Sequence, residues 1–237
     1  MAEAATQTHT EQHDEKVSRV RSSYSRPVFM QELTLHSLQA QRVVDRSLSR
    51  VSYSLFSLDV ILQVIGKRDQ VDQVEEVVSG LINEGATTLD NGIAQLQARL
   101  KEHGYESLPQ YTNPKQQTIE ISSPNVAKFA RLISKLDTVI SLLDTLWLHG
   151  LVTSKQRTNA AQDWQQFLNK LASRIIGVEK QARIAAHREG KQDEVNQAAP
   201  ETEEHDLDRE AAALSESTVD EKAHEAEPAK TQAAASA

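Results

Sequence analysis

The chemically suggestive groups of this chain are bases, and the residue patterns typical of enzymes do not occur. Its 237 residues contain no glycine-rich phosphate loop, no nucleophile elbow and no cysteine, so disulfides and thiolate metal sites are excluded. Asp137 and Asp144 lie seven residues apart, and this two-turn helical spacing favours a polar stripe or a helix-pairing contact over catalysis. The histidines between the chain ends are scattered, with no i, i+4 ligand pair among them. We therefore expect no enzymatic activity, no metal, no cofactor and no small-molecule substrate.

An excess of bases in the middle of the chain is found when the net charge of -8 is divided by region. Residues 1–15 carry four acids and no Lys or Arg, and residues 193–237 carry thirteen acids and three bases. Residues 16–192 carry 23 bases against 17 acids, and the excess lies in 111–192, with twelve bases against six acids. A basic folded core between acidic ends suggests a polyanionic partner. The alternative is a solvated helix surface that needs no partner.

The basic stretch begins with a predicted strand at residues 116–121. Isoleucine alternates there with polar residues, a period of two that is typical of a half-buried strand. Ile119 and Ile121 would face the core. The side chains on the opposite face would be those of Gln116, Thr118 and Glu120.

Two long helices should follow this strand. Ser123 is a good N-cap and Pro124 suits the first helical position, so the first helix starts here and ends at Gly150. Thr153 is the predicted cap of the second helix, which runs past Arg183. Both helices have apolar residues at helical spacing on one face. The side of the first helix opposite its apolar residues carries Lys128, Arg131 and Lys135.

The preceding half of the chain is also expected to be largely helical. Alternation at residues 28–36 suggests a strand. Residues 42–65 have a helical pattern, and their second half, residues 55–65, is apolar nearly all round, as in a buried helix. Residues 69–103 keep helical spacing, with a break or kink expected at Asp90–Gly92. Residues 104–115 contain two prolines and read as a loop. The expected anchors of this loop are Tyr105 and Tyr111.

Three regions result from these patterns. Residues 1–26 are a predicted flexible arm, 27–191 a helical domain with one or two short β-strands, and 192–237 an acidic disordered tail. The predicted fold class is mainly α. No run of about 20 apolar residues occurs, so we expect no membrane-spanning helix, and the acidic first residues do not form a secretory signal.

Several short motifs within residues 28–188 resemble one known family. They are LPQYTNP at 108–114, TIEISSP at 118–124, KLD at 135–137, LLDTLWL at 142–148, QR at 156–157 and WQ at 164–165. Together they resemble the AcaB-like family, whose members occur in conjugative plasmids and integrating conjugative elements. Most members are uncharacterised, and some are regarded as transcriptional activators of transfer genes with a ribbon-helix-helix-like part.

The resemblance implies a specific mode of DNA binding. In ribbon-helix-helix folds two strands, one from each subunit, pair and enter the major groove, where outward polar side chains read base edges. The second helix holds a phosphate at its N-terminus. Glu120 departs from this pattern, since a base or an amide would serve better there, and both helices are longer than a minimal fold needs. An intramolecular ribbon with residues 32–36 is the alternative. The predicted DNA-binding residues are Gln116, Thr118, Glu120, Thr153, Ser154, Lys155, Arg157, Lys128 and Arg131.

The function expected from the bases and the resemblance is that of a DNA-binding regulator, an activator of conjugative transfer genes. It would act on double-stranded DNA as a homodimer in the bacterial cytoplasm. The alternative is a non-catalytic helical accessory protein of an integrating conjugative element, which would use the same helical surface to bind a protein partner.

Overall fold

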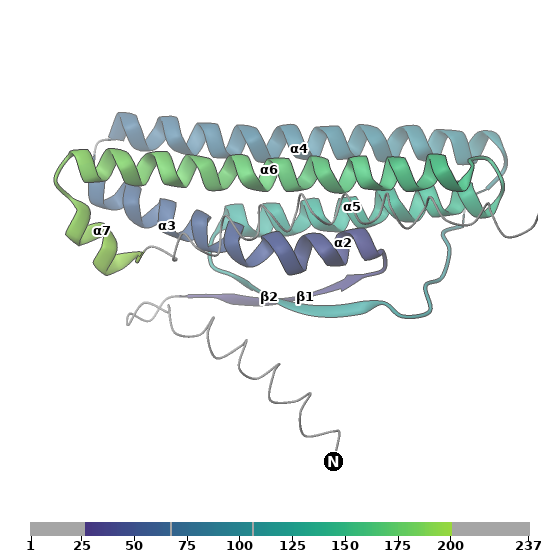
Figure 1. The fold of residues 1–237 in the computed structure, drawn as a ribbon, viewed down its shortest axis with the longest axis horizontal. Helices are drawn as coiled ribbons and strands as arrows, with labels where there is room; N and C mark the ends of the chain where they lie inside the picture. Colours follow the sequence, from purple (N-terminus) through teal and green to yellow (C-terminus); the bar gives the residue numbers. More distant parts are fainter. Residues whose placement is uncertain (1–26, 67, 106, 201–237) are drawn as a thin grey trace, which may run out of the picture. The chain divides into compact units, whose positions relative to one another are not determined.

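The described part of the chain is mainly helical with one small sheet, which confirms the predicted fold class (Figure 1). The computed structural model describes residues 27–66, 68–105 and 107–200, and of residues 68–70 the backbone alone. The predicted arm and residues 201–237 of the predicted tail lie outside the described residues. The elements are β1 (Phe29–Leu35), α2 (Leu38–Val43), η1 (Val44–Leu48), α3 (Ser49–Ile65), α4 (Arg68–Glu102), β2 (Lys115–Ile121), α5 (Pro124–Leu148), α6 (Ser154–Arg188) and α7 (Gln192–Ala198).

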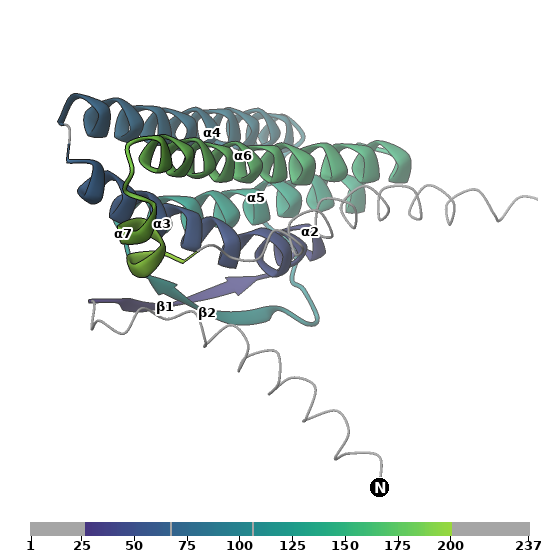
Figure 2. The same cartoon turned by 60° about the vertical axis from the view of Figure 1, so that its left-hand side comes forward.

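Helix α5 is the core of the helical layers. In Figures 1 and 2, α4 and α6 run side by side, α5 and the α2–α3 helix lie beneath them, and the sheet lies beneath that second layer. Helix α5 contacts α4, α6, α2, α3 and both strands. It is therefore buried on most of its circumference, and Phe129, Ile133, Leu136, Ile140 and Leu146 are completely or almost completely removed from solvent.

The helix before α4 is continuous and starts earlier than predicted. It runs over Leu38–Ile65, with π-helical hydrogen bonding in η1. Ser37 caps its start by accepting a hydrogen bond from the Ala40 amide, and Gly66 ends it with a positive φ of 69°. The helix is long and apolar enough to cross a membrane, with a mean hydropathy of 1.3, but half of that window is buried inside the protein. This burial is what a core helix shows.

The predicted break at Asp90–Gly92 is wrong, because α4 continues through it without interruption. A Cβ atom on Gly92 would lie 2.6 Å from the Trp164 ring, and one on Gly85 would lie 2.6 Å from Cδ2 of Leu171. These glycines therefore let large side chains of α6 approach the α4 backbone closely. The packing gain offsets the low helix propensity of glycine, which costs about 1 kcal/mol relative to Ala.

The predicted start of the disordered tail is too early. Helix α7 occupies seven residues assigned to the tail, and its Val195 is completely buried. Just before it, Nζ of Lys191 donates hydrogen bonds of 2.6 and 3.0 Å to the carbonyls of Val64 and Ile65. These are terminal carbonyls of α3 that lack partners within the helix. One apolar side chain and one capping lysine thus hold a segment that composition alone assigns to disorder.

A buried ion pair completes the attachment of α7. Arg183 on α6 lies 2.7 Å from the carboxylate of Glu179, one turn earlier, and both side chains are buried. Its Nη1 donates a 2.8 Å hydrogen bond to the carbonyl of Ala199, the residue after α7. The guanidinium thus satisfies a carboxylate and the carbonyl that follows α7 together, which burial of both requires.

Asp59 on α3 is the one described carboxyl whose pKa is raised far from its ordinary value. Burial, together with the charge of Glu75 on α4, raises the pKa of Asp59 from 3.8 to about 6. The folded state therefore binds more protons than the unfolded chain between these two values. The contribution of this carboxyl to the free energy of unfolding therefore falls as pH rises through that window.

We predict that Gly92→Ala lowers the melting temperature and that Gly80→Ala raises it or leaves it unchanged. The new methyl at Gly92 would overlap the Trp164 ring and cost about 1–3 kcal/mol. At Gly80, also within α4, no atom lies within 4 Å, so alanine improves helix propensity alone. Thermal unfolding followed by circular dichroism measures both, and equal shifts would contradict the close contact.

We predict that Asp59→Asn raises the melting temperature above pH 6 and that the difference disappears below about pH 4. The amide cannot ionise, so it avoids the cost of charging a half-buried group beside Glu75. Asp72→Asn, at an exposed position on α4, is the matched control and should show little pH-dependent difference. A benefit of Asp59→Asn that is the same at every pH would refute the electrostatic cause.

Candidate nucleic-acid interface

The two strands form a ribbon within one chain. β1 pairs antiparallel with β2, from Phe29 opposite Ile121 to Leu35 opposite Lys115. The resemblance implied strands paired between subunits, so this expectation is corrected in favour of the intramolecular alternative. The physical reason is that the inner faces of both strands share one apolar core. This inner face buries Leu33, Leu35 and Ile119.

The outer face of the ribbon is polar. Gln116 and Thr118 are exposed and Glu120 is half-buried, so the predicted outward orientation of these side chains is confirmed. Opposite them on β1 lie Thr34, Glu32 and Met30, in that order. These three were missed as site residues, although the alternation of Leu33 and Leu35 already indicated which side of β1 faces outward.

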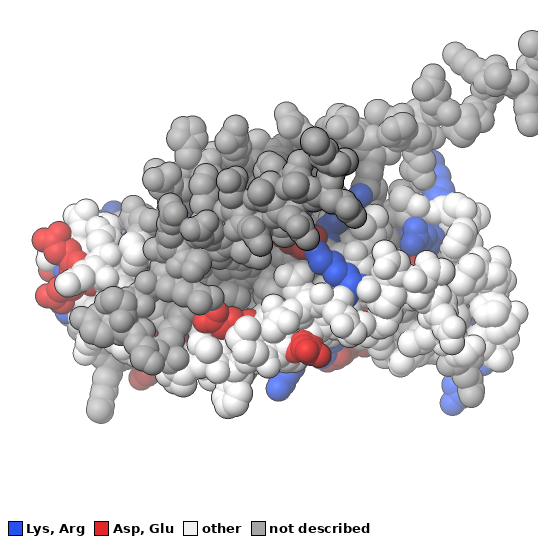
Figure 3. All heavy atoms as spheres, turned by 90° about the horizontal axis from the view of Figure 1, so that it is seen from below, with Lys and Arg blue, Asp and Glu red and all other residues white. Residues whose placement is uncertain are grey.

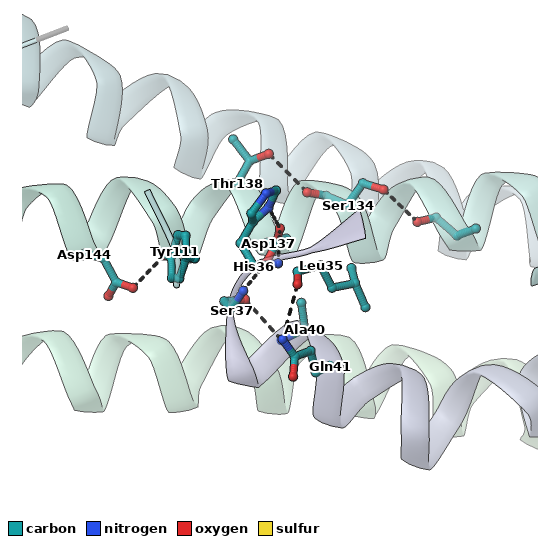
Figure 4. Close-up of polar contacts among 11 residues, drawn as sticks. Leu35, His36, Ser37, Ala40, Gln41, Tyr111, Ser134, Asp137, Thr138 and Asp144 are labelled. Atoms are coloured by element: carbon teal, nitrogen blue, oxygen red, sulfur yellow. Dashed lines mark hydrogen bonds and ion pairs between the residues drawn. The ribbon is translucent and has the colours of Figure 1, made fainter. Parts of the chain in front are cut away.

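A buried carboxylate fixes the end of β1. Asp137 on α5 accepts hydrogen bonds from the backbone amides of His36 and Ser37, the latter at 2.7 Å (Figure 4). Its Oδ2 also lies 2.9 Å from Nδ1 of His36. These amides belong to the turn that leads from β1 into α2, where N–H groups have no helical partner and an acid is favourable. The ribbon is thereby anchored to the core helix.

A second buried carboxylate fixes the approach to β2. Asp144 on α5 accepts a 2.7 Å hydrogen bond from the hydroxyl of Tyr111 and lies 2.6 Å from Nε of Arg157 on α6. Burial first, and then Asp144, raise the pKa of Tyr111, so its hydroxyl stays protonated and donates. The loop before β2 and helix α6 are both tied to α5 here. Asp144 thus makes the predicted helix-pairing contact, and Tyr111 anchors the loop as predicted.

The start of α6 is closed by its own side chains. Thr153 accepts a 3.2 Å hydrogen bond from the Gln156 amide, and the Gln156 side chain accepts one from the Thr153 amide, which forms a capping box. Ser154 accepts a 3.1 Å hydrogen bond from the indole of Trp147. The predicted cap is therefore confirmed. The amide of Thr153 and the hydroxyls of Thr153 and Ser154, which were expected to meet phosphate, therefore already have partners within the protein.

The two bases predicted at this helix end differ in availability. Arg157 is paired with Asp144, and its guanidinium lies 5.8 Å from the centre of the Trp147 ring, a cation–π arrangement. Much of its charge is balanced inside the protein. Lys155, by contrast, is exposed. It is the more accessible of these two side chains for contact with a polyanion.

The predicted DNA-binding residues fall into three groups rather than one compact site. The ribbon face is the first. Lys128 and the exposed Arg131 lie in the opening turns of α5, and residues 153–157 lie beyond its last turn. The 17 residues of α5 from Arg131 to Leu148 separate these two basic groups by roughly 25 Å along the helix. Figure 3, which looks onto the sheet side, shows Lys and Arg in separate places on the uncovered surface, not in one continuous patch.

The described residues gather no group of three or more His, Asp or Glu side chains that could hold a metal ion. The buried acids of α5 have other partners. Asp137 binds backbone amides and the His36 ring, and Asp144 binds a phenol and a guanidinium. The chemistry available to the outer surface is therefore hydrogen bonding by amide, hydroxyl and carboxylate groups, with separate bases around it.

We predict that Asp137→Asn lowers the free energy of unfolding by about 3 kcal/mol, because charged hydrogen bonds to two amides are lost and one amide faces an NH₂ group. Asp90→Asn is the control. Asp90 pairs with Lys135 at 2.6 Å but more than half of its side chain is exposed, so its loss should cost under about 1 kcal/mol. Urea unfolding measures the free energy of unfolding of both variants. Similar losses in the two would contradict the stabilising role of the Asp137 hydrogen bonds.

The chain resembles one protein of known structure over most of its length. The match is the crystal structure of selenomethionine-containing AcaB from uropathogenic E. coli, with 56% sequence identity and a TM-score of 0.74. It covers 76% of this chain and 93% of that chain. No protein-family model matches this chain, and the search of curated proteins found no match. Identity at this level over nearly the whole of the AcaB chain shows that this protein belongs to the AcaB-like family.

Proposed function

We propose that this protein is a DNA-binding regulator of conjugative transfer genes that reads double-stranded DNA with the outer face of its β1–β2 ribbon. The observation that carries the proposal is an exposed polar face on a two-stranded ribbon that is anchored to a helical core. A ribbon of this width fits the major groove of B-DNA. The AcaB-like resemblance supports the proposal, because it implies regulators of this kind, including activators.

The side chains of the outer face suit base edges better than phosphates. The Gln116 amide can bond adenine through N6 and N7, and the hydroxyls of Thr34 and Thr118 can bond several bases. The carboxylates of Glu32 and Glu120 would repel phosphate but can accept a hydrogen bond from N4 of cytosine. The acids that depart from the expected pattern would therefore contribute to sequence choice and favour cytosine.

Phosphate contacts would come from bases outside the ribbon. Lys128, Arg131 and Lys155 are candidates for these contacts, which position a protein on DNA without reading its sequence. Arg157 is a weaker candidate because it is paired with Asp144. A homodimer would place two ribbons on one operator and double the number of bases read.

We predict that Gln116→Ala combined with Thr118→Ala removes the preference for cognate over random DNA and leaves non-specific affinity nearly unchanged. Each lost base contact should cost about 1–3 kcal/mol of discrimination. Fluorescence anisotropy of the full chain measures this on duplexes from transfer-gene promoters and on random duplexes, across a salt series. Gln97→Ala, at an exposed position on α4, is the control.

The basic residues have a different expected signature in the same assay. Lys128→Ala combined with Arg131→Ala should weaken binding to all duplexes and reduce the salt dependence by about one counterion per lost contact. Weak binding that is equal on every duplex, and unchanged in both double variants, would reject the ribbon as a DNA reader.

One observation favours the alternative function of a non-catalytic accessory protein. Trp147 and Leu148 at the end of α5 are 41% and 62% exposed, and Leu108 in the loop before β2 is 52% exposed. Exposed aromatic and aliphatic side chains are typical of protein interaction surfaces. If the anisotropy assay shows no sequence preference, these side chains are the first to replace in a search for a protein partner.

A further inference from the structure

An exposed apolar surface lies where α4 and α5 end and α6 begins, at the right-hand end of Figure 1. Trp147 and Leu148 belong to the last turn of α5, and Leu108 belongs to the loop before β2. Tyr105, three residues before Leu108, stacks on His149 with ring centroids 3.6 Å apart. This stacking brings the loop to the end of α5. We name Leu108, Trp147 and Leu148 the end patch.

The contacts of the end patch hold it in place. The Trp147 indole donates a 3.1 Å hydrogen bond to Ser154, and the Arg157 guanidinium lies 5.8 Å from the ring centre. At the same end a small apolar cluster is buried, and Leu151 and Val152 pack against it. The buried members of this cluster are Leu100, Leu142 and Leu146. A surface that is already positioned loses little conformational entropy when a partner binds.

Positive charge lies beside the end patch. Residues 99–103 and 147–157 together carry four Lys or Arg and one acid. Arg99 donates a 2.9 Å hydrogen bond to a carbonyl of the turn between α5 and α6, which places its charge at this end. Lys155 is exposed in the first turn of α6, next to the serine that binds the Trp147 indole. Both bases therefore lie next to exposed apolar surface.

We propose that the end patch binds an acidic amphipathic helix of a protein partner. The apolar side chains of that helix would cover the end patch, and its carboxylates would face Arg99 and Lys155. Burial of the exposed apolar area stabilises such a complex, and the opposite charges fix its orientation. This proposal goes beyond DNA reading by the ribbon, because it assigns a second class of partner to a different surface. It holds for a DNA-binding regulator and for an accessory protein alike.

The combination of leucines and bases selects this partner over others. A nucleic acid would match the bases, and a nucleobase could stack on Trp147, but Leu108 and Leu148 offer nothing to phosphate or sugar. A basic peptide would match the apolar side chains and be repelled by Arg99 and Lys155. An acidic amphipathic helix matches both features at once.

Three labelled peptides and the full chain test the proposal by fluorescence anisotropy. The first probe is about 16 residues long, with Leu at i, i+3, i+4 and i+7 spacing and Glu elsewhere. The second has Lys in place of Glu, and the third has Ser in place of Leu. The acidic amphipathic probe should bind with a dissociation constant at least roughly tenfold below those of the other two.

Substitutions on the protein locate the binding surface. Leu148→Asp, Leu108→Asp and Lys155→Glu should each raise the dissociation constant of the acidic probe at least roughly fivefold. Lys155→Glu should also tighten binding of the basic probe. The matched control is Ile184→Asp, at another exposed apolar position about 45 Å along α6 from its start, and it should change neither value. Circular dichroism checks the fold, and Leu108 lies in a loop, so at least one apolar variant does not alter a helix.

Several outcomes would overturn the proposal. One is equal affinity for all three probes, and another is an acidic probe whose affinity the end-patch variants do not change. A single-stranded oligonucleotide that binds the end patch more tightly than the acidic probe would assign it to nucleic acid. A dimer that Leu148→Asp dissociates would assign it to a second copy. Failure of sequence-specific DNA binding leaves all of these results unchanged, so the two proposals fail separately.

Discussion

Two carboxylates buried on one helix determine where the surrounding segments lie. A carboxylate removed from water is costly unless donors surround it, so α5 can be buried only if other parts of the chain bring donors to Asp137 and Asp144. The backbone amides at the end of β1 serve the first, and a phenol and a guanidinium serve the second. The ribbon and the start of α6 take their positions from these contacts. Stability and the geometry of the candidate interface therefore share one origin.

Features with local causes were predictable from the sequence. Ser123 and Thr153 cap their helices, and Gly150 adopts a positive φ of 72°, because each acts on amides or carbonyls a few residues away. The outward orientation of Gln116 and Thr118 was also predictable, since side chains of a strand alternate between its faces. The mainly helical class follows from the same local periodicity.

Features that depend on a distant partner were not predictable. Gly92 reads as a helix breaker until Trp164 of another helix is found against it. Arg157 reads as a free base at a helix start until Asp144, across the α5–α6 turn, is seen to pair with it. The tail boundary was misplaced for the same reason, because Val195 is buried by α3 and α6. In each case the deciding group lies on another helix.

The pairing of β1 with β2 has a consequence for biosynthesis. The chain leaves the ribosome from its N-terminus, so β1 emerges well before β2, with α2, α3 and α4 translated between them. During that interval the edge of β1 has no partner, and Leu33 and Leu35 have no complete core to enter. During this interval β1 is an unpaired strand that could associate with strands of other chains. The three charged or polar residues among its seven, together with its short length, limit the risk of misassociation before β2 is translated.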